Sequence, residues 1–288
     1  PAVLAYRCWG LGVQTAGPAV AGFFANLTPL FAAIMSSVFL GDLPKVYHVV
    51  AFGLMQPQVS STAQGDEALR AELTACGCSA DILEADVSDA QAIGRVVEHA
   101  LSRYGTIHGL VNNAAIGPLG TVLDTDEALF ERILAVNLKG TYLASRAVLP
   151  HMIRAGGGAI VNIGSGAGYG KPNMAAYSAS KAGILGLSMA MAYDHFHDHV
   201  RVNVAIPGGG GIVSGMSVGR MGGDTQAFVN KPATGTVAGR PATGRDLARA
   251  VAFLLSDESE AITGSVIDVG CFAHQGGPIG PKPSREFR

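Results

Sequence analysis

Charged residues are scarce in this sequence, at 15% of 288 residues, and nearly absent from its opening stretch. Between Pro1 and Gly65 the only charged side chains are Arg7, Asp42 and Lys45. The whole chain balances 20 Lys and Arg against 22 Asp and Glu, a formal net charge of -2. This balance excludes a strongly basic surface, so we expect no nucleic-acid partner.

Cysteine is also rare, and its spacing excludes a zinc site or a redox pair. The four cysteines are Cys8, Cys76, Cys78 and Cys271. No C-x-x-C motif is present, so we expect reduced, packed thiols. His195 and His199 lie one helical turn apart, but no third ligand accompanies them. The sequence therefore predicts no metal site.

A long uncharged run fills the opening stretch. Residues 16–40 would form an apolar helix of about 37 Å, against a bilayer core of about 30 Å. We therefore expect a membrane-derived helix through which the chain associates with a membrane. A buried helix of a soluble protein and a secretory signal remain alternatives, although Asn26 and Pro29 interrupt the run.

The stretch "GPAVAGFFANLTPLFAAIMSSVFLGDLPKVYHVVAFGL" resembles the closing helical hairpin of the drug/metabolite transporter superfamily. In that family a proline-kinked helix ends at a Leu-Gly-acid turn, here residues 40–42, and a second apolar helix follows. The resemblance covers residues 8–55, and the second helix breaks off near Met55. It implies an apolar helical segment over residues 1–56. One hairpin cannot transport a solute, because transport paths need many helices.

The texture changes after residue 56 to apolar runs that alternate with amphipathic helical stretches. Such alternation is typical of βαβ units around a parallel sheet. We expect strands at 80–87, 108–115, 158–165, 200–208 and 264–270, and helices at 66–77, 89–105, 127–153, 175–196 and 244–256. The predicted fold is α/β, a doubly wound, Rossmann-like parallel sheet over residues 57–288, N-terminally truncated and preceded by the apolar helical segment.

Six motifs in this part of the chain carry a family resemblance. They read "VNNAA", "VNLKGTYLASRA", "IVNIGSGAG", "YSASKAG", "RVNVAIPGG" and "ITGSVIDVG". Their order and spacing over residues 58–272 resemble the classical short-chain dehydrogenases/reductases. The resemblance implies an oxidoreductase that transfers hydride between NAD(P) and a small carbonyl compound or secondary alcohol. It also implies a homo-oligomer and a cytoplasmic location for the reductase-like domain.

Tyr177 and Lys181 lie four residues apart on a predicted helix and so share one face. An ammonium near the phenol favours phenolate, so we expect a lowered pKa for Tyr177. The resemblance implies that Tyr177 exchanges the substrate's hydroxyl proton and that Ser165 hydrogen-bonds the developing oxyanion. It assigns Lys181 to the nicotinamide ribose as well as to Tyr177, and Asn137 to a water that relays the proton.

The resemblance also implies a cofactor-binding set beside Tyr177 and Lys181. Its members are Asp86 and Val87 at the adenine, Asn113 beside the adenosine, and Pro207, Gly208, Ile212 and Ser214 near the nicotinamide. The "PGGGG" loop, residues 207–211, is longer than the family's usual loop. The Gly-, Ser- and Met-rich residues 213–240 are typical of a mobile substrate lid.

The family's phosphate loop, TGxxxGxG, has no clear counterpart here. "TAGPAVAG", residues 15–22, places Ala16 and Val20 where glycines are expected, and it stands too far from Asp86. Counting back from Asp86, the phosphate loop should fall within residues 30–39. We hypothesise that a transporter tail replaces the first strand, loop and helix, as in a chimeric or frameshifted reading frame; Pro1 agrees with a fragment. Cofactor binding is then expected to be impaired.

A further strand is expected to end at Val59 and Ser60, and the residues after it indicate the choice of coenzyme. No carboxylate follows at once to bind a ribose 2′-hydroxyl, since Asp66 comes too late, and this favours NADPH over NADH. The leading hypothesis is an NAD(P)-dependent carbonyl reductase or alcohol dehydrogenase. The alternatives are an inactive binding or scaffold protein and a membrane-anchored reductase-like domain.

Overall fold

The fold is a parallel sheet of five strands in the order β1-β2-β3-β4-β5. A computed structural model describes residues 49–52, 81–208, 212, 215–220, 222–224, 226, 236–240, 242–270 and 272. The strands are β1 (Val49–Phe52), β2 (Gly109–Asn112), β3 (Gly158–Ile163), β4 (Val200–Ile206) and β5 (Val266–Asp268). Each pairs in parallel with the next.

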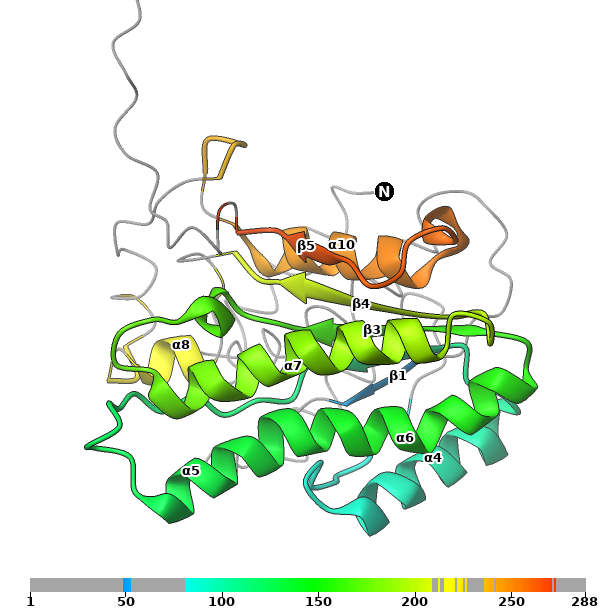
Figure 1. The fold of residues 1–288 in the computed structure, drawn as a ribbon, viewed down its shortest axis with the longest axis horizontal. Coiled ribbons are helices and arrows are strands. Elements are labelled where there is room, and N and C mark those ends of the chain that lie inside the picture. The colour runs from blue at the N-terminus through cyan, green and yellow to red at the C-terminus, as the bar shows by residue number, and fades with distance from the viewer. Residues whose placement is uncertain are drawn as a thin grey trace, which may run out of the picture.

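Helices connect the strands and cover both faces of the sheet (Figure 1). They are α4 (Ala90–Tyr104), α5 (Glu127–Leu134), α6 (Gly140–Arg154), α7 (Ala175–Asp194), α8 (Gly215–Gly219) and α10 (Gly244–Leu255). A π-helical turn, Ala135–Lys139, joins α5 to α6. Asp89 caps α4 by accepting a hydrogen bond from the Gln91 amide.

Alternation along the strands divides the core into two clusters. Leu110, Ile160 and Val202 face α4, α6 and α7. Their neighbours Val111 and Val161 face the other way, toward α10. Because both faces are covered, the buried strands are almost wholly apolar. The predicted α/β class with a parallel, Rossmann-like sheet is confirmed.

The central strands carry a buried polar ladder amid these apolar side chains. Asn112 of β2 and Asn162 of β3 are register partners, and Nδ2 of Asn112 donates to Oδ1 of Asn162 at 2.8 Å. Asn162 in turn donates to Ser188 of α7 at 2.8 Å, and Asn112 donates to Ser145 of α6 at 3.3 Å. We call these four residues the asparagine ladder. It ties the sheet to two helices on one face.

Residues 49–52 correct the expectation of a helix that continues to Met55. They form β1, which pairs with β2 from Val49↔Gly109 to Phe52↔Asn112. The β-branched pair Val49 and Val50 favours a strand, and a paired sheet edge satisfies its backbone. We expected the family's first strand to be replaced by a helix, but β1 occupies the position beside β2. This strand lies before residue 56, within the segment predicted to be helical.

The strand predicted at residues 80–87 is a second correction. The described residues 81–86 form no regular element, and most of their side chains are partly or fully exposed. A strand needs a neighbouring strand, and within the described part of the chain none pairs with them.

The apolar segment and the "TAGPAVAG" stretch, residues 1–48, lie outside the described residues. So do the predicted helix at 66–77 and the residues Val59 and Ser60 used for coenzyme choice. In the portion of the chain that the structure does describe, no helix combines the length and apolarity required to cross a bilayer.

Candidate active site

The predicted site residues follow the carboxyl ends of three neighbouring strands. Asn113 comes directly after β2, Ser165 follows β3, and Pro207 follows β4. Tyr177 and Lys181 stand on the first turns of α7, which packs against β4 and against the short helix that Ser165 caps. In a parallel α/β sheet, ligands bind at this edge of the strands.

Ser165 lies close enough to the Tyr177 hydroxyl to lower its pKa through a hydrogen-bonding interaction. The Ser165 hydroxyl also accepts from the Ala167 amide at 3.1 Å, which holds its rotamer. Tyr177 is only 8% exposed, and this burial raises its pKa above the usual 10, although Ser165 and the Arg220 charge act in the opposite direction. The lowered pKa expected for Tyr177 is therefore wrong in this structure, because desolvation outweighs the effects of Ser165 and Arg220.

Lys181 is buried beneath the tyrosine, with 2% of its surface exposed. Its Nζ donates to the Ile163 carbonyl at 2.7 Å and lies 5.8 Å from the centroid of the Tyr177 ring. Burial lowers the pKa of Lys181 from 10.5 to about 8. Within the described part of the chain the ammonium has this one hydrogen-bond acceptor, so it can still donate to a ligand.

Asn137 lies in the π-helical turn and is fully buried. Its side-chain oxygen accepts from the Ile116 amide at 2.8 Å, while its Nδ2 donates to the Ile116 carbonyl and to Ser180, both at 2.9 Å. Its main-chain carbonyl accepts from Thr141 at 2.8 Å. The side chain thus braces α7 against the loop after β2.

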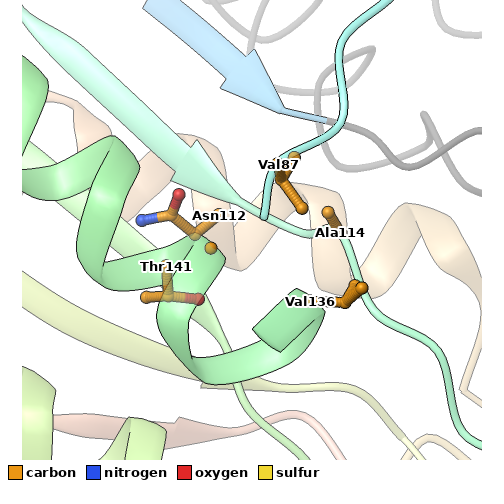
Figure 2. A pocket seen from close by; sticks show the side chains of 6 residues that line it. Val87, Asn112, Ala114, Val136 and Thr141 are labelled. Atoms are coloured by element: carbon orange, nitrogen blue, oxygen red, sulfur yellow. The ribbon is translucent and has the colours of Figure 1, made fainter. Parts of the chain in front are cut away.

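The residues assigned to adenine lie before α4. Asp86 accepts from the Ser88 amide at 2.8 Å and hydroxyl at 2.7 Å, and from Arg132 of α5 at 3.3 Å. The Val87 side chain is buried in the core. It also lines a small hollow at the end of β2, together with Val136 of the π-helical turn (Figure 2).

The loop after β4 approaches α10 closely. Gly208 has no room for a side chain, since a Cβ there would overlap the Ala242 side chain. Ile212 packs against the cluster on the α10 face, and its carbonyl accepts from Ser217 at 2.8 Å. Ser214 lies outside the described residues.

Arg220 belongs to the site but was not singled out by the sequence. It follows α8, in the segment predicted to be a lid, and its Cζ lies 5.3 Å from the centroid of the Tyr177 ring. Its Nε and Nη2 donate to the Gly117 carbonyl at 3.0 and 2.6 Å. The sequence signal that could have identified Arg220 is its positive charge among the small residues of the segment 213–240.

His195, one of the two histidines that we weighed as metal ligands, pairs with a carboxylate. Its Nδ1 lies 2.8 Å from Oδ2 of Asp198.

Comparison with known proteins agrees with this geometry. Residues 56–271 match the family described as "Enoyl-(Acyl carrier protein) reductase". The chain is 41% identical, over 69% of its length and 78% of the relative's, to 2-(S)-hydroxypropyl-CoM dehydrogenase 3 of Xanthobacter autotrophicus. It is 33% identical to 2-keto-3-deoxy-L-fuconate dehydrogenase of Xanthomonas campestris, over 77% of this chain and 71% of that protein.

Solved structures show the same architecture. Levodione reductase superposes with a TM-score of 0.63 at 28% identity, covering 73% of this chain and 83% of the other. The relatives named here are dehydrogenases or reductases, and the matched residues include every catalytic residue predicted above. The chain belongs to the short-chain dehydrogenase/reductase family, whose enzymes use NAD(P).

Proposed function

We propose that this chain catalyses the reversible, NAD(P)-dependent interconversion of a carbonyl compound and a secondary alcohol. The observation that carries the proposal is the buried Tyr177, whose hydroxyl interacts with Ser165 and whose ring has the Lys181 ammonium 5.8 Å from its centroid. A proton donor, an oxyanion donor and a cation at one sheet edge suit polarisation of a carbonyl.

The described residues fit the nicotinamide half of the cofactor. Lys181 is a buried ammonium with a single protein acceptor, and ribose hydroxyls would satisfy its remaining N–H groups. Tyr177 would share that ribose, Asp86, Val87 and Asn113 would hold the adenosine half, and Pro207, Gly208, Ile212 and Ser214 would border the nicotinamide. When bound, the nicotinamide supplies the hydride for reduction and accepts it in oxidation.

The chain's own residues manage the proton and the developing charge. In reduction, Tyr177 donates its hydroxyl proton to the carbonyl oxygen, which becomes the alcohol oxygen. Ser165 donates a hydrogen bond to that oxygen as charge develops on it. The raised pKa of Tyr177 keeps the phenol protonated and suits it to this acid role. Proton resupply would pass through a water held by the Asn137 carbonyl.

We further propose that the chain prefers NADPH and holds its phosphates weakly. β1 stands where the family's first strand stands, and the chain then continues as "GLMQPQ", with Gly53 as the one glycine before Gly65. Backbone amides in a glycine turn normally bind the pyrophosphate. Calorimetry with NADPH and NADH tests the coenzyme preference and the weak binding. A dissociation constant for NADPH in the low micromolar range would refute the weak binding.

The decisive experiment is a turnover assay of the purified chain with a panel of ketones and secondary alcohols. Tyr177→Phe removes only the hydroxyl, so we expect at least a roughly hundredfold loss of kcat, because general acid catalysis contributes on this order. Cofactor affinity should change little. Tyr193→Phe, an exposed tyrosine at the end of α7, is the matched control. Full activity in Tyr177→Phe would refute the mechanism.

A cofactor-free binding or scaffold protein is the second candidate, favoured by the lack of a glycine-rich turn after Phe52 in the sequence. Absence of both turnover and dinucleotide binding would support it. Membrane fractionation with and without residues 1–48 tests the anchoring proposal.

A further inference from the structure

Arg220 is a cation without a partner of opposite charge among the residues that the structure describes. It is partly buried, and its only hydrogen bonds in the described structure are the two donated to the Gly117 carbonyl. Both Nε and Nη2 point to this single neutral oxygen, while Nη1 has no acceptor among the described residues. A guanidinium out of water normally pairs with a carboxylate or another anion. Arg220 therefore has unused capacity to bind one.

Arg220 lies beside the catalytic tyrosine, Tyr177. Its Cζ lies 5.3 Å from the Tyr177 ring centroid, and its charge acts on the Tyr177 hydroxyl. A side chain on Gly117 would come within 2.6 Å of Nη2 of Arg220, 2.8 Å of Sδ of Met216 and 3.0 Å of the Tyr177 ring. The absence of a Cβ at Gly117 lets the lid residues and the catalytic tyrosine meet at this point.

The charges around Tyr177 are of one sign. Lys181 lies 5.8 Å and Arg220 5.3 Å from its ring, and no carboxylate pairs with either in the described part of the site. Two positive charges beside the reacting tyrosine attract anions and repel cations. A neutral ketone would use neither the charge nor the fork-shaped donors of Arg220.

We propose that Arg220 binds an anionic group of the substrate, so that the enzyme acts on carbonyl compounds and alcohols that carry a carboxylate, sulfonate or phosphate a few bonds from the reacting carbon. This inference rests on the proposed reductase function. The anionic oxygens replace the Gly117 carbonyl as acceptors for the guanidinium. They thereby orient the carbonyl toward Tyr177.

The test compares matched acidic and neutral probes. Levulinate and its methyl ester share the same ketone, and acetonesulfonate and hydroxyacetone phosphate distinguish sulfonate and phosphate from carboxylate. We expect at least one acid to exceed the ester about tenfold in kcat/KM, a difference of about 1.4 kcal/mol. In Arg220→Met this acid-to-ester ratio should fall about tenfold, mainly through KM, and Arg220→Lys should retain part of it.

Arg249→Met is the control, because Arg249 is an exposed arginine of α10 and its loss removes the same charge. It should leave the ratio unchanged. If Arg220 only latches the lid, Arg220→Met would affect acids and ester equally. That result, or a wild-type ratio near one for all three acids, overturns the proposal.

A binding measurement separates this proposal from the reductase function. Saturation-transfer NMR detects the same probes on the chain without turnover. Arg220-dependent binding of an acid, with no turnover by wild type, would refute the reductase function alone. Turnover of ester and acids with an Arg220-independent ratio would refute the anion site alone.

Discussion

At the scale of single residues, burial controls the chemistry of the site more than charge does. Tyr177 and Lys181 are 8% and 2% exposed. The pKa of Tyr177 is raised and that of Lys181 is lowered, so that each shift favours the neutral form of the side chain. The cost of removing a charge from water acts on both groups in this direction. Burying the charged form of Lys181 therefore costs the folded state free energy, and deprotonation of the ammonium relieves this cost.

We predict that Lys181 makes the folded chain more stable as the pH rises above about 8. The folded pKa is about 8 and the ordinary value is 10.5, so the unfolded state binds more protons between these values. The cost of burying the ammonium is fully present below pH 8 and is relieved through this window, by at most roughly 3 kcal/mol. Urea unfolding at a series of pH values measures the rise.

Lys181→Met should abolish this rise, and Lys171→Met, at an exposed lysine, should preserve it. The measurements should stay below pH 10, where the raised pKa of Tyr177 begins to destabilise the folded state. Identical pH profiles for wild type and Lys181→Met would contradict the prediction.

Residue spacing predicted where the catalytic groups lie but not their environment. Four-residue spacing on a helix places Tyr177 and Lys181 on one face whatever the tertiary fold. The sign of the Tyr177 pKa shift depends on burial by segments distant in sequence, which spacing does not contain. The contact between Arg220 and Tyr177 was unpredictable for the same reason, because the two residues are 43 positions apart in the sequence and meet only in the tertiary fold.

At the scale of elements, α10 begins with an unusually complete cap. Asp246 accepts at 2.8 Å from both the amide and the hydroxyl of Thr243, and Arg240 donates to both of its carboxylate oxygens at 2.7 and 2.8 Å. This capping box fixes the start of the helix that covers the second face of β3 and β4.

We predict that Asp246→Ala lowers the free energy of unfolding by about 1 to 2 kcal/mol, the usual loss for a helix cap. Chemical denaturation monitored by circular dichroism measures this change. Glu260→Ala, at an exposed acid just after the same helix region, should change it by less than about 0.5 kcal/mol. Equal effects of the two substitutions would argue against a capping role.

Elements with strong periodicity were predicted well, and those defined by a tertiary partner were not. The helices at 89–105 and 175–196 and the strands at 158–165 and 200–208 correspond to α4, α7, β3 and β4. The expected helix over 49–52 failed because a short apolar run suits either state, and pairing with β2 decides it. The π-helical turn at Asn137 could not be predicted, because a single turn is too short to show a hydrophobic periodicity in the sequence.

At the scale of the whole molecule, the asparagine ladder joins the two central strands to α6 and α7. We predict that Asn162→Ala costs about 2 to 3 kcal/mol of stability, since it leaves a buried amide of Asn112 with only its longer bond to Ser145. Equilibrium unfolding of the single and double variants measures this.

The double-mutant cycle of Asn112→Ala and Asn162→Ala should give a coupling energy of about 1 kcal/mol. Val161→Ala, at the neighbouring position that faces α10, should be additive with Asn112→Ala. A coupling energy near zero between the two asparagines would show that the ladder contributes nothing beyond packing.

The ladder also has a consequence for folding errors. β3 and β4 consist largely of Val, Ile and Ala, and β2 contributes Leu110 and Val111, so a strand displaced by two residues would still bury an apolar face. Such a displacement would separate Asn112 from Asn162 and trap both amides without their partners, at a cost of about 1 to 3 kcal/mol for each. The buried asparagines thus penalise mispaired sheets selectively, and a chain without them should populate misfolded, aggregation-prone forms during refolding.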